Sequence, residues 1–307
     1  LGLILLGYLR DKDRRQAVAL VIMAAGLVEV VHGLPTWIAG GRPSVALTGS
    51  FYWWNPFAAF LLAPALLSLA AVAWRARPAR LLGAATFPLC AAGIVLSTSR
   101  ATMACLAAGT LALVGVATFG PGRRRRLLRC AGLLAAAAAV VLALTGPPFF
   151  PARVGALGGT SARGQSQSLA DNGTYRVQFW REALVVAGRN PIAGAGFHSL
   201  GTASQRGTPP TWARSNLAHN GFLQVLSDGG LLLGVPFLAV LIGSGFGLAR
   251  VGRRAVRGAR AAPVDPGEDD SETWLRLGVP VAAAGLLAHS AVDFDWSHPA
   301  DLAMLAA

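Results

Sequence analysis

Long apolar segments constrain this sequence more than any other feature. A membrane-spanning helix needs about 20 mostly apolar residues, and the chain offers seven such segments: 16–34, 56–74, 81–98, 102–119, 127–146, 228–248 and 277–294. We expect helices because a helix closes its backbone hydrogen bonds within one segment. The sequence therefore predicts an all-α, polytopic bundle of transmembrane helices with about seven complete spans.

The composition excludes several other classes of protein. Hydrophobic residues make up 54% of the chain and charged residues 13%, whereas a soluble domain is about 45–50% apolar and about 25% charged. An ordinary soluble enzyme, a disordered chain and a collagen-like chain are thereby excluded. Both ends of the sequence lie within apolar runs, and residues 1–9 resemble the tail of an earlier span. We interpret 1–307 as a single polytopic membrane domain, truncated at both ends.

Basic charge is distributed unevenly between the loops. The net charge is +13, and 18 of the 27 basic residues lie in four loops: 10–15, 75–80, 121–129 and 249–276. Cytoplasmic loops of membrane proteins carry an excess of Lys and Arg, and placing these four loops inside fits seven spans without conflict. We favour anchoring at anionic lipid over nucleic-acid binding for the run Arg123–Arg126. We therefore expect a multi-pass protein of the cytoplasmic membrane, with membrane lipids as partners and no nucleic acid.

The longest extracytoplasmic segment predicted by this topology covers 147–218. Its first part includes a Gly-, Ser- and Gln-rich stretch at 155–169. Thr174 is a suitable N-cap for a helix over 175–188, and one helical face carries the apolar residues Val177, Trp180, Leu184 and Val185. We expect this short amphipathic helix to lie on or in the outer surface. On the inner side, 249–276 is predicted to be a linker with an acidic stretch at 261–272.

Arg100 is the only charged residue between Leu81 and Phe119, and it follows Ser97, Thr98 and Ser99. The surrounding segment is long enough for two spans, so Arg100 is predicted to lie at their outer turn. An arginine near membrane depth is costly and commonly faces a cavity or a partner. It can also extend its head group to the membrane interface. Position alone leaves both interpretations open.

A polar series precedes and enters the span at 228–248. Asn216, Asn220, Gln224 and Asp228 follow one another at intervals of four residues. Such a polar face suggests a wet cavity within the bundle, and His219 at its outer edge can act as a base. The alternative is a polar helix end exposed to water.

Two other groups of polar residues lie in the predicted outer segments. Arg176 and Arg181 bracket Trp180, and arginine forks suit phosphate oxygens, although a solvated charged face is the commoner fate of such residues. Near the end of the chain, two histidines and two aspartates lie within 289–298. Their spacing matches no standard metal site, so we predict no metal and favour a hydrogen-bonded cluster at a helix end.

Together these segments resemble the O-antigen ligase / Wzy polymerase (Wzy_C, WaaL-like) family of polytopic membrane proteins. The resemblance rests on LTGSFYWWNPFAAF at 47–60, STSRA at 97–101, RVQFWREALVVAGRNPIAGAG at 176–196, AHNGFLQVLSDGGLLLG at 218–234 and AHSAVDFDWSHP at 288–299. It covers nearly all of the chain, with an O-antigen ligase-like core at 81–250. The chain departs from the family at Asp228, where glutamate is usual, and at Trp53–Trp54.

The resemblance implies a GT-C-like glycosyltransferase that uses a glycan on a polyprenyl diphosphate carrier, such as undecaprenyl diphosphate. A ligase transfers the glycan to a lipid or protein acceptor, and a polymerase joins repeat units. The family picture is metal-independent and needs no cofactor. It assigns diphosphate binding to Arg100 and Arg176, and activation of the acceptor hydroxyl to His219. Further candidates for substrate contacts are Asn220, Arg181, Arg214 and Gln224.

This chemistry agrees with the residue types. Arginines placed in advance stabilise the negative charge that develops on a diphosphate leaving group, and a nearby base lowers the cost of attack by a sugar hydroxyl. The preference for arginine over lysine and the alanine content indicate a GC-rich bacterial genome. From the resemblance and the predicted outer position of the candidate residues, we expect an outward-facing active site that serves cell-envelope polysaccharide biosynthesis.

Two other functions fit a multi-pass membrane protein. A transporter for a small anion or solute predicts ionisable residues or broken helices near the membrane centre, whereas the candidates here lie at outer mouths of spans. A non-catalytic scaffold predicts that Arg100 and His219 matter only for stability. The enzymatic hypothesis instead requires Arg100, Arg176 and His219 to share one phosphate-sized site.

Overall fold

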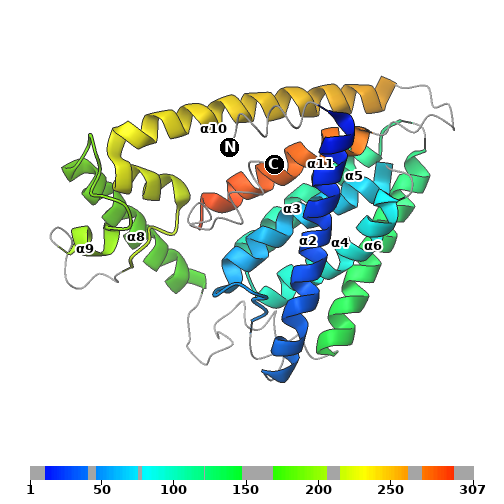
Figure 1. The fold of residues 1–307 in the computed structure, drawn as a ribbon, viewed down its shortest axis with the longest axis horizontal. Coiled ribbons are helices and arrows are strands. Elements are labelled where there is room, and N and C mark those ends of the chain that lie inside the picture. Colours follow the sequence, from blue (N-terminus) through cyan, green and yellow to red (C-terminus); the bar gives the residue numbers. More distant parts are fainter. Residues whose placement is uncertain are drawn as a thin grey trace. The chain divides into compact units, whose positions relative to one another are not determined.

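The computed structural model describes residues 11–40, 46–74, 78–120, 122–146, 169–205, 215–261 and 272–293. Within these ranges the regular structure is entirely helical (Figure 1). The chain divides into two compact units, one containing 1–149, 248–287 and 299–307 and the other containing 150–247 and 288–298. Several predicted features lie outside the described residues: the tail at 1–9, most of 155–169, Arg214, most of the acidic stretch and the sequence after 293.

Six described helices, together with the last part of α10 (Gly221–Ala261), contribute to the first unit. The six are α2 (Lys12–Ala39), α3 (Trp54–Trp74), α4 (Ala79–Ser97), α5 (Arg100–Ala117), α6 (Arg123–Thr145) and, for most of its length, α11 (Thr273–Ser290). The second unit contains α8 (Leu169–Arg189), α9 (Leu200–Ser204) and the first part of α10 (Gly221–Ala261).

The helices confirm the predicted all-α membrane architecture. Among the described residues, α2, α3, α4, α5, α6 and α10 are long and apolar enough to cross a membrane. The seventh predicted span, 277–294, corresponds to α11, which is helical but is not one of these six. Arg276 near its start and His289 near its end lower the mean hydropathy of this helix. Both side chains are costly to place in hydrocarbon.

Helix α3 is the centre of the first unit. Seventeen of its 21 residues are buried, which is expected of a helix that is apolar on all sides. It contacts α2, α4, α5 and α6, and these helices lie around it in Figure 1. Helix α11 also packs against it, since Gly278 approaches Leu67 and Ala70, and Gly285 approaches Leu62.

Glycines permit the closest helix contacts in this unit. A Cβ atom added to Gly26 of α2 would lie 2.4 Å from Cβ of Pro64, and one added to Gly109 of α5 would lie 2.7 Å from a methyl group of Leu66. Small residues let helix backbones approach closely, which is how membrane helices gain packing energy when lipid already surrounds their apolar faces. The apolar side chains of α3 are thus matched by glycines on its neighbours.

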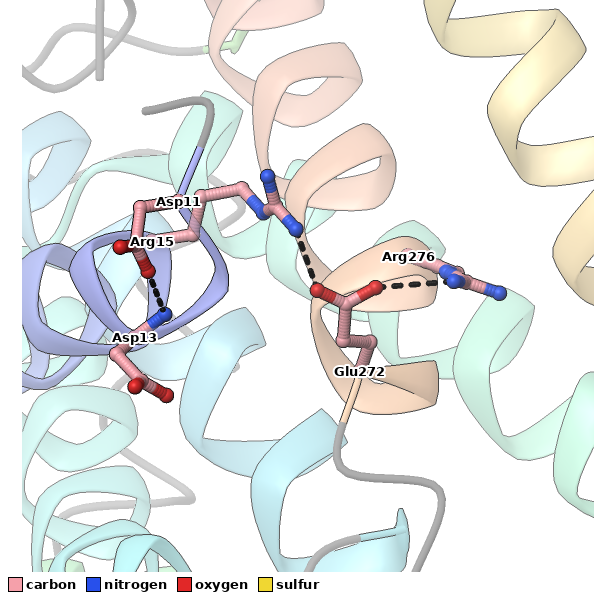
Figure 2. A network of polar contacts seen from close by, with 5 residues as sticks. All are labelled: Asp11, Asp13, Arg15, Glu272 and Arg276. Carbon is pink, nitrogen blue, oxygen red and sulfur yellow. Dashed lines mark hydrogen bonds and ion pairs between the residues drawn. The ribbon is translucent and has the colours of Figure 1, made fainter. Parts of the chain in front are cut away.

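Polar contacts join ends of the first unit that the charge pattern predicted to lie on one side. Nη2 of Arg15 lies 2.5 Å from Oε1 of Glu272, and Nη2 of Arg276 lies 2.9 Å from Oε2 of the same carboxylate (Figure 2). Nη1 of Arg129 donates to the carbonyls of Val72 and Ala73 at the end of α3. These contacts link loops predicted to be cytoplasmic, in agreement with a shared side for them.

The start of α2 belongs to the same network. The side chain of Asp11 caps the helix, because its Oδ1 accepts a hydrogen bond from the Asp13 N–H at 2.7 Å (Figure 2). An acidic N-cap satisfies one of the unpaired N–H groups of the first turn and complements the helix dipole. The cap fixes the turn from which Arg15 reaches Glu272.

Helices α8 and α10 differ from their predictions. Helix α8 confirms a helix near 175–188 but begins at Leu169, and its packed face carries Ala183, Val186 and Ala187, whereas Val177 and Leu184 are 41% and 52% exposed. The predicted apolar stripe is therefore not the packed face, because small alanines allow closer contact. Helix α10 continues to Ala261, so the first part of the predicted linker is helical.

We predict that replacing Glu272 by Gln lowers the stability of the first unit only above acidic pH. The hydrogen bond from Arg15 is the main cause that lowers the pKa of Glu272 below its usual 4.5. Burial opposes it, and the hydrogen bond from Arg276 and the charges of both arginines lower the pKa further. Because the pKa is lowered in the folded state, the carboxylate stabilises the fold fully above its unfolded pKa, and this stabilisation disappears as the pH falls through the folded value.

The measurement is thermal unfolding in detergent at pH 7 and at pH 3.5 for the original protein and Glu272→Gln. Partly exposed ion pairs contribute about 0.2–1 kcal/mol each, so we expect a Tm lower by a few degrees at pH 7 and a smaller difference at pH 3.5. Asp13→Asn, which changes an exposed acid of α2, is the control. A difference that is equal at both pH values would contradict the prediction.

Candidate functional site

The second unit is built around a small apolar core next to a strained turn. Ala183 and Val186 of α8 pack with Leu200 of α9 and with Ala218, which immediately precedes His219. His219 has a backbone φ of 49°, a left-handed conformation that is uncommon for residues other than glycine and that gathers at functional sites. The core of this unit therefore holds a histidine in a conformation that must be stabilised by its surroundings.

Aromatic residues of α8 lie against the His219 turn. The ring of Phe179 lies 5.5 Å from the imidazole, centroid to centroid, and Nε1 of Trp180 donates to the His219 carbonyl at 3.4 Å. Trp180 was expected on an apolar stripe, but its indole N–H has a specific partner, as is usual for a partly buried tryptophan. No pattern in the sequence predicts this contact between α8 and the turn.

Asn220 forms the start of α10. Its Oδ1 accepts hydrogen bonds from the N–H groups of Phe222 and Leu223, at 3.0 and 3.1 Å, which is the geometry of an asparagine N-cap. Since α10 begins at Gly221, Asn216 and Asn220 precede the helix and do not belong to a continuous helical stripe. Only Gln224 and Asp228 of the predicted polar face lie within it.

Three predicted site residues converge on one short segment, 291–293. Nη1 of Arg176 donates to the Val292 carbonyl, and Nδ2 of Asn220 donates to the Ala291 carbonyl at 2.8 Å. Nδ1 of His219 lies 3.7 Å from Oδ1 of Asp293. Residues separated by more than 40 positions in the sequence are thus brought together by the segment that follows α11.

Asp293 is a further candidate for the site, which the sequence pattern had placed only in a hydrogen-bonded cluster within 289–298. Its side chain is 2% exposed, whereas that of His219 is 26% exposed. Burial is the largest influence on this carboxyl and by itself raises its pKa. The interaction with His219 and the cationic groups around it outweigh burial and hold the pKa of Asp293 below its ordinary value, so the group is a carboxylate at neutral pH.

The remaining candidates of the second unit occupy different settings. Arg181 is exposed on α8, and Arg214 lies outside the described residues. Gln224 and Asp228 are each 6% exposed, and Nε2 of Gln224 donates to Oδ1 of Asp228 at 3.0 Å. Within the described residues, no group of three or more His, Cys, Asp or Glu side chains is arranged to hold a metal ion.

Arg100 lies in the first unit, at the predicted turn between two spans. Helix α4 ends at Ser97 and α5 begins at Arg100, with Thr98 in a left-handed conformation at φ 67°. Oγ of Ser99 pairs with Oγ1 of Thr102 at 2.9 Å and makes no cap bond. A helix N-terminus favours anions, so an arginine there adds to a positive local field.

These features define a multi-pass helical membrane protein with an Arg–His–Asp cluster in its second unit and an arginine at a helix start in its first. The chain belongs to the O-antigen ligase family, whose sequence model matches residues 85–238, half of the chain. The matched region contains Arg100, Arg176 and His219 and ends before Asp293. No curated protein matches the chain. The family match confirms the resemblance found in the sequence.

We predict that Asp293→Asn lowers activity at least tenfold while protein remains in the membrane. The substitution keeps the size of the side chain but removes the charge beside His219, and charged partners that orient a histidine are important to its action as a base. Surface glycan measured against membrane protein level tests this in a deletion host. Asp13→Asn in α2 removes an exposed acid and serves as the matched control; equal glycan in both variants would remove Asp293 from the site.

Proposed function

We propose that this protein transfers a glycan from a polyprenyl diphosphate carrier to an acceptor hydroxyl at the outer face of the cytoplasmic membrane. The convergence of Arg176, His219 and Asn220 on 291–293 is the observation that carries the proposal. Membership of the O-antigen ligase family supports it. The acceptor is a glycan, a lipid or a protein, and the reaction is independent of metals and cofactors.

In the proposed reaction the acceptor oxygen attacks the anomeric carbon of the donor glycan. A carbon–oxygen bond forms to the acceptor, and the bond between the anomeric carbon and the phosphate oxygen breaks. The electron pair leaves with the lipid diphosphate, and the acceptor proton passes to His219. An imidazole whose Nδ1 side faces a carboxylate presents Nε2 as the base, which is the arrangement that Asp293 favours.

Arginine supplies the charge that the leaving group requires. Arg176 is held in place by its bond to the Val292 carbonyl, and a guanidinium has five N–H donors with which to meet phosphate oxygens. The local setting of Arg100 at the first turn of α5 supports a second anion contact there. Donors fixed before the reaction stabilise developing charge without a reorganisation cost.

We predict that each of three variants reduces product formation at least a hundredfold without loss of protein from the membrane. The variants are His219→Ala, Arg176→Ala and Arg100→Ala. Removing one charged donor from such a site typically costs about 10²–10³ in rate. The variants are expressed in a host deleted for the gene, and surface glycan is read on a gel beside membrane protein levels. Arg189→Ala, at an exposed position in the last turn of α8, is the matched control.

The glycan pattern of the deletion host separates the two subclasses of enzyme. Single repeat units in the products indicate a lost polymerase, whereas full-length chains that remain on the carrier indicate a lost ligase. Wild-type glycan in all three variants would reject the enzymatic proposal and favour a transporter or a scaffold. If an alanine variant loses both protein and glycan, the conservative variants Arg176→Lys and Arg100→Lys are tested in its place. They keep the charge but remove the guanidinium fork.

A further inference from the structure

We infer that Gln224 and Asp228 are positioning residues that fix the backbone turn carrying His219. The inference rests on the proposed function of His219 but concerns different residues and a different property of the site. Gln224 was expected to contact substrate. Its burial and its two hydrogen bonds inside the protein point to a role behind the site.

The two side chains form a buried relay between backbone groups. Oε1 of Gln224 accepts a hydrogen bond from the Ala218 N–H at 2.7 Å, and Nε2 of Gln224 donates to Oδ1 of Asp228 at 3.0 Å. The other carboxylate oxygen, Oδ2, accepts from the His198 N–H at 3.3 Å. The relay therefore runs from the residue before His219, through α10, to the loop that follows α8.

The relay has a direction that determines which residue types can form it. Both of its ends are backbone N–H groups, which only donate. A glutamine in the middle accepts at one end and donates at the other, so the last member must accept from both sides. A carboxylate does this, whereas an asparagine at 228 would place a donor against a donor and leave one buried group unsatisfied, at a cost of about 1–3 kcal/mol.

The far end of the relay is firmly anchored. The Asp228 carbonyl accepts from the Gly196 N–H at 3.0 Å, and a Cβ atom added to Gly194 would lie 2.3 Å from that carbonyl oxygen. A Cβ atom added to Gly230, which has φ 56° at the kink inside α10, would lie 2.6 Å from the carbonyl oxygen of Ile192. The loop at 192–198 is thus fitted to the kink of α10, and Asp228 has little freedom to move.

At its other end, the relay supports the left-handed backbone turn at His219. His219 has φ 49°, and its carbonyl is held by Trp180. The N–H of Ala218, the residue before His219, has Gln224 as its partner. If this bond is lost, the left-handed conformation loses one of its restraints and the imidazole can turn away from Asp293.

Gln224→Glu tests the direction of the relay with almost no change in shape. When the new side chain is protonated, its carbonyl oxygen accepts from Ala218 and its O–H donates to Asp228, so the relay is restored. When it is ionised, two carboxylates face each other in a buried site, which raises the pH at which the pair loses its shared proton. Gln224→Met keeps the approximate size but can make neither bond at any pH.

The activity assay uses membranes of the deletion host, which carry the natural donor and acceptor, and compares each variant with wild type between pH 6 and 8. Division by the wild-type rate removes the titration of other groups on the surrounding elements, which are Arg176, Glu182, His198, His219, His289 and Asp293. We expect the relative activity of Gln224→Glu to rise at least fivefold from pH 8 to pH 6. We expect Gln224→Met to remain at least tenfold below wild type throughout.

Hydrogen exchange of the full-length protein in nanodiscs provides a readout that does not depend on activity. Gln224→Met should accelerate exchange in the peptide containing Ala218 and leave α3 unchanged. Ser227→Ala is the matched control, because Ser227 is a buried residue of the same helix whose hydroxyl donates to the Gln224 backbone carbonyl and takes no part in the relay.

The outcomes separate failure of the relay from failure of the proposed function. Wild-type exchange and activity in Gln224→Met, or a relative activity of Gln224→Glu that does not change with pH, would overturn the positioning role. Full activity of His219→Ala would overturn the proposed function, and exchange at Ala218 would still decide whether the relay holds the turn. If Gln224→Met fails to accumulate, the pH dependence of Gln224→Glu gives the decision.

Discussion

Close packing around α3 is the constraint on which the first unit depends. Lipid tails solvate apolar side chains as well as a protein interior does, so membrane helices associate through shape and van der Waals contact. Helix α3 is apolar on every side and is buried along most of its length. Its neighbours meet it with glycines at positions 26, 109, 278 and 285. This packing holds the ends of α4 and α5 in a turn only two residues long, and that turn determines where Arg100 begins its helix.

The second unit depends on directional polar contacts to a much greater extent. Among the described residues its apolar core is small, with four buried members, and the candidate site is assembled by hydrogen bonds to backbone carbonyls at 291–293. Backbone acceptors are well suited to this purpose, because their position is set by the chain and does not depend on a rotamer. Arg176 ties the segment carrying Asp293 to α8, and Asn220 ties it to the start of α10; both residues border the candidate site.

The sequence predicted the parts of the structure that follow from periodicity and charge. Apolar length identified the helices, and the loop arginines predicted that Arg15 and Glu272 would lie on one side. Family motifs indicated Arg176 and His219. Contacts between segments that are distant in the sequence could not be predicted. The proposed role of Asp293 requires the end of α11 to approach the start of α10. The sequence placed Asp293 in a polar cluster within 289–298 but did not indicate His219 as its partner. Intervals of four residues suggested a helical stripe from Asn216 onward, but the N-cap geometry of Asn220 starts the helix later.

The local settings of Arg100, His219 and Asp293 bear on the proposed function. Arg100 occupies the first turn of α5, where the helix dipole disfavours a cation by roughly 0.3–1 kcal/mol. His219 occupies a left-handed backbone conformation, which costs of order 1–3 kcal/mol. Asp293 is an ionised group taken almost entirely out of water. The first two arrangements cost free energy in the fold, whereas the charge of Asp293 is supported by His219 and the cationic groups around it. The proposed glycan transfer would use all three, because it needs a cation near the departing diphosphate and an oriented base before the substrate arrives, whereas a scaffold has no use for them.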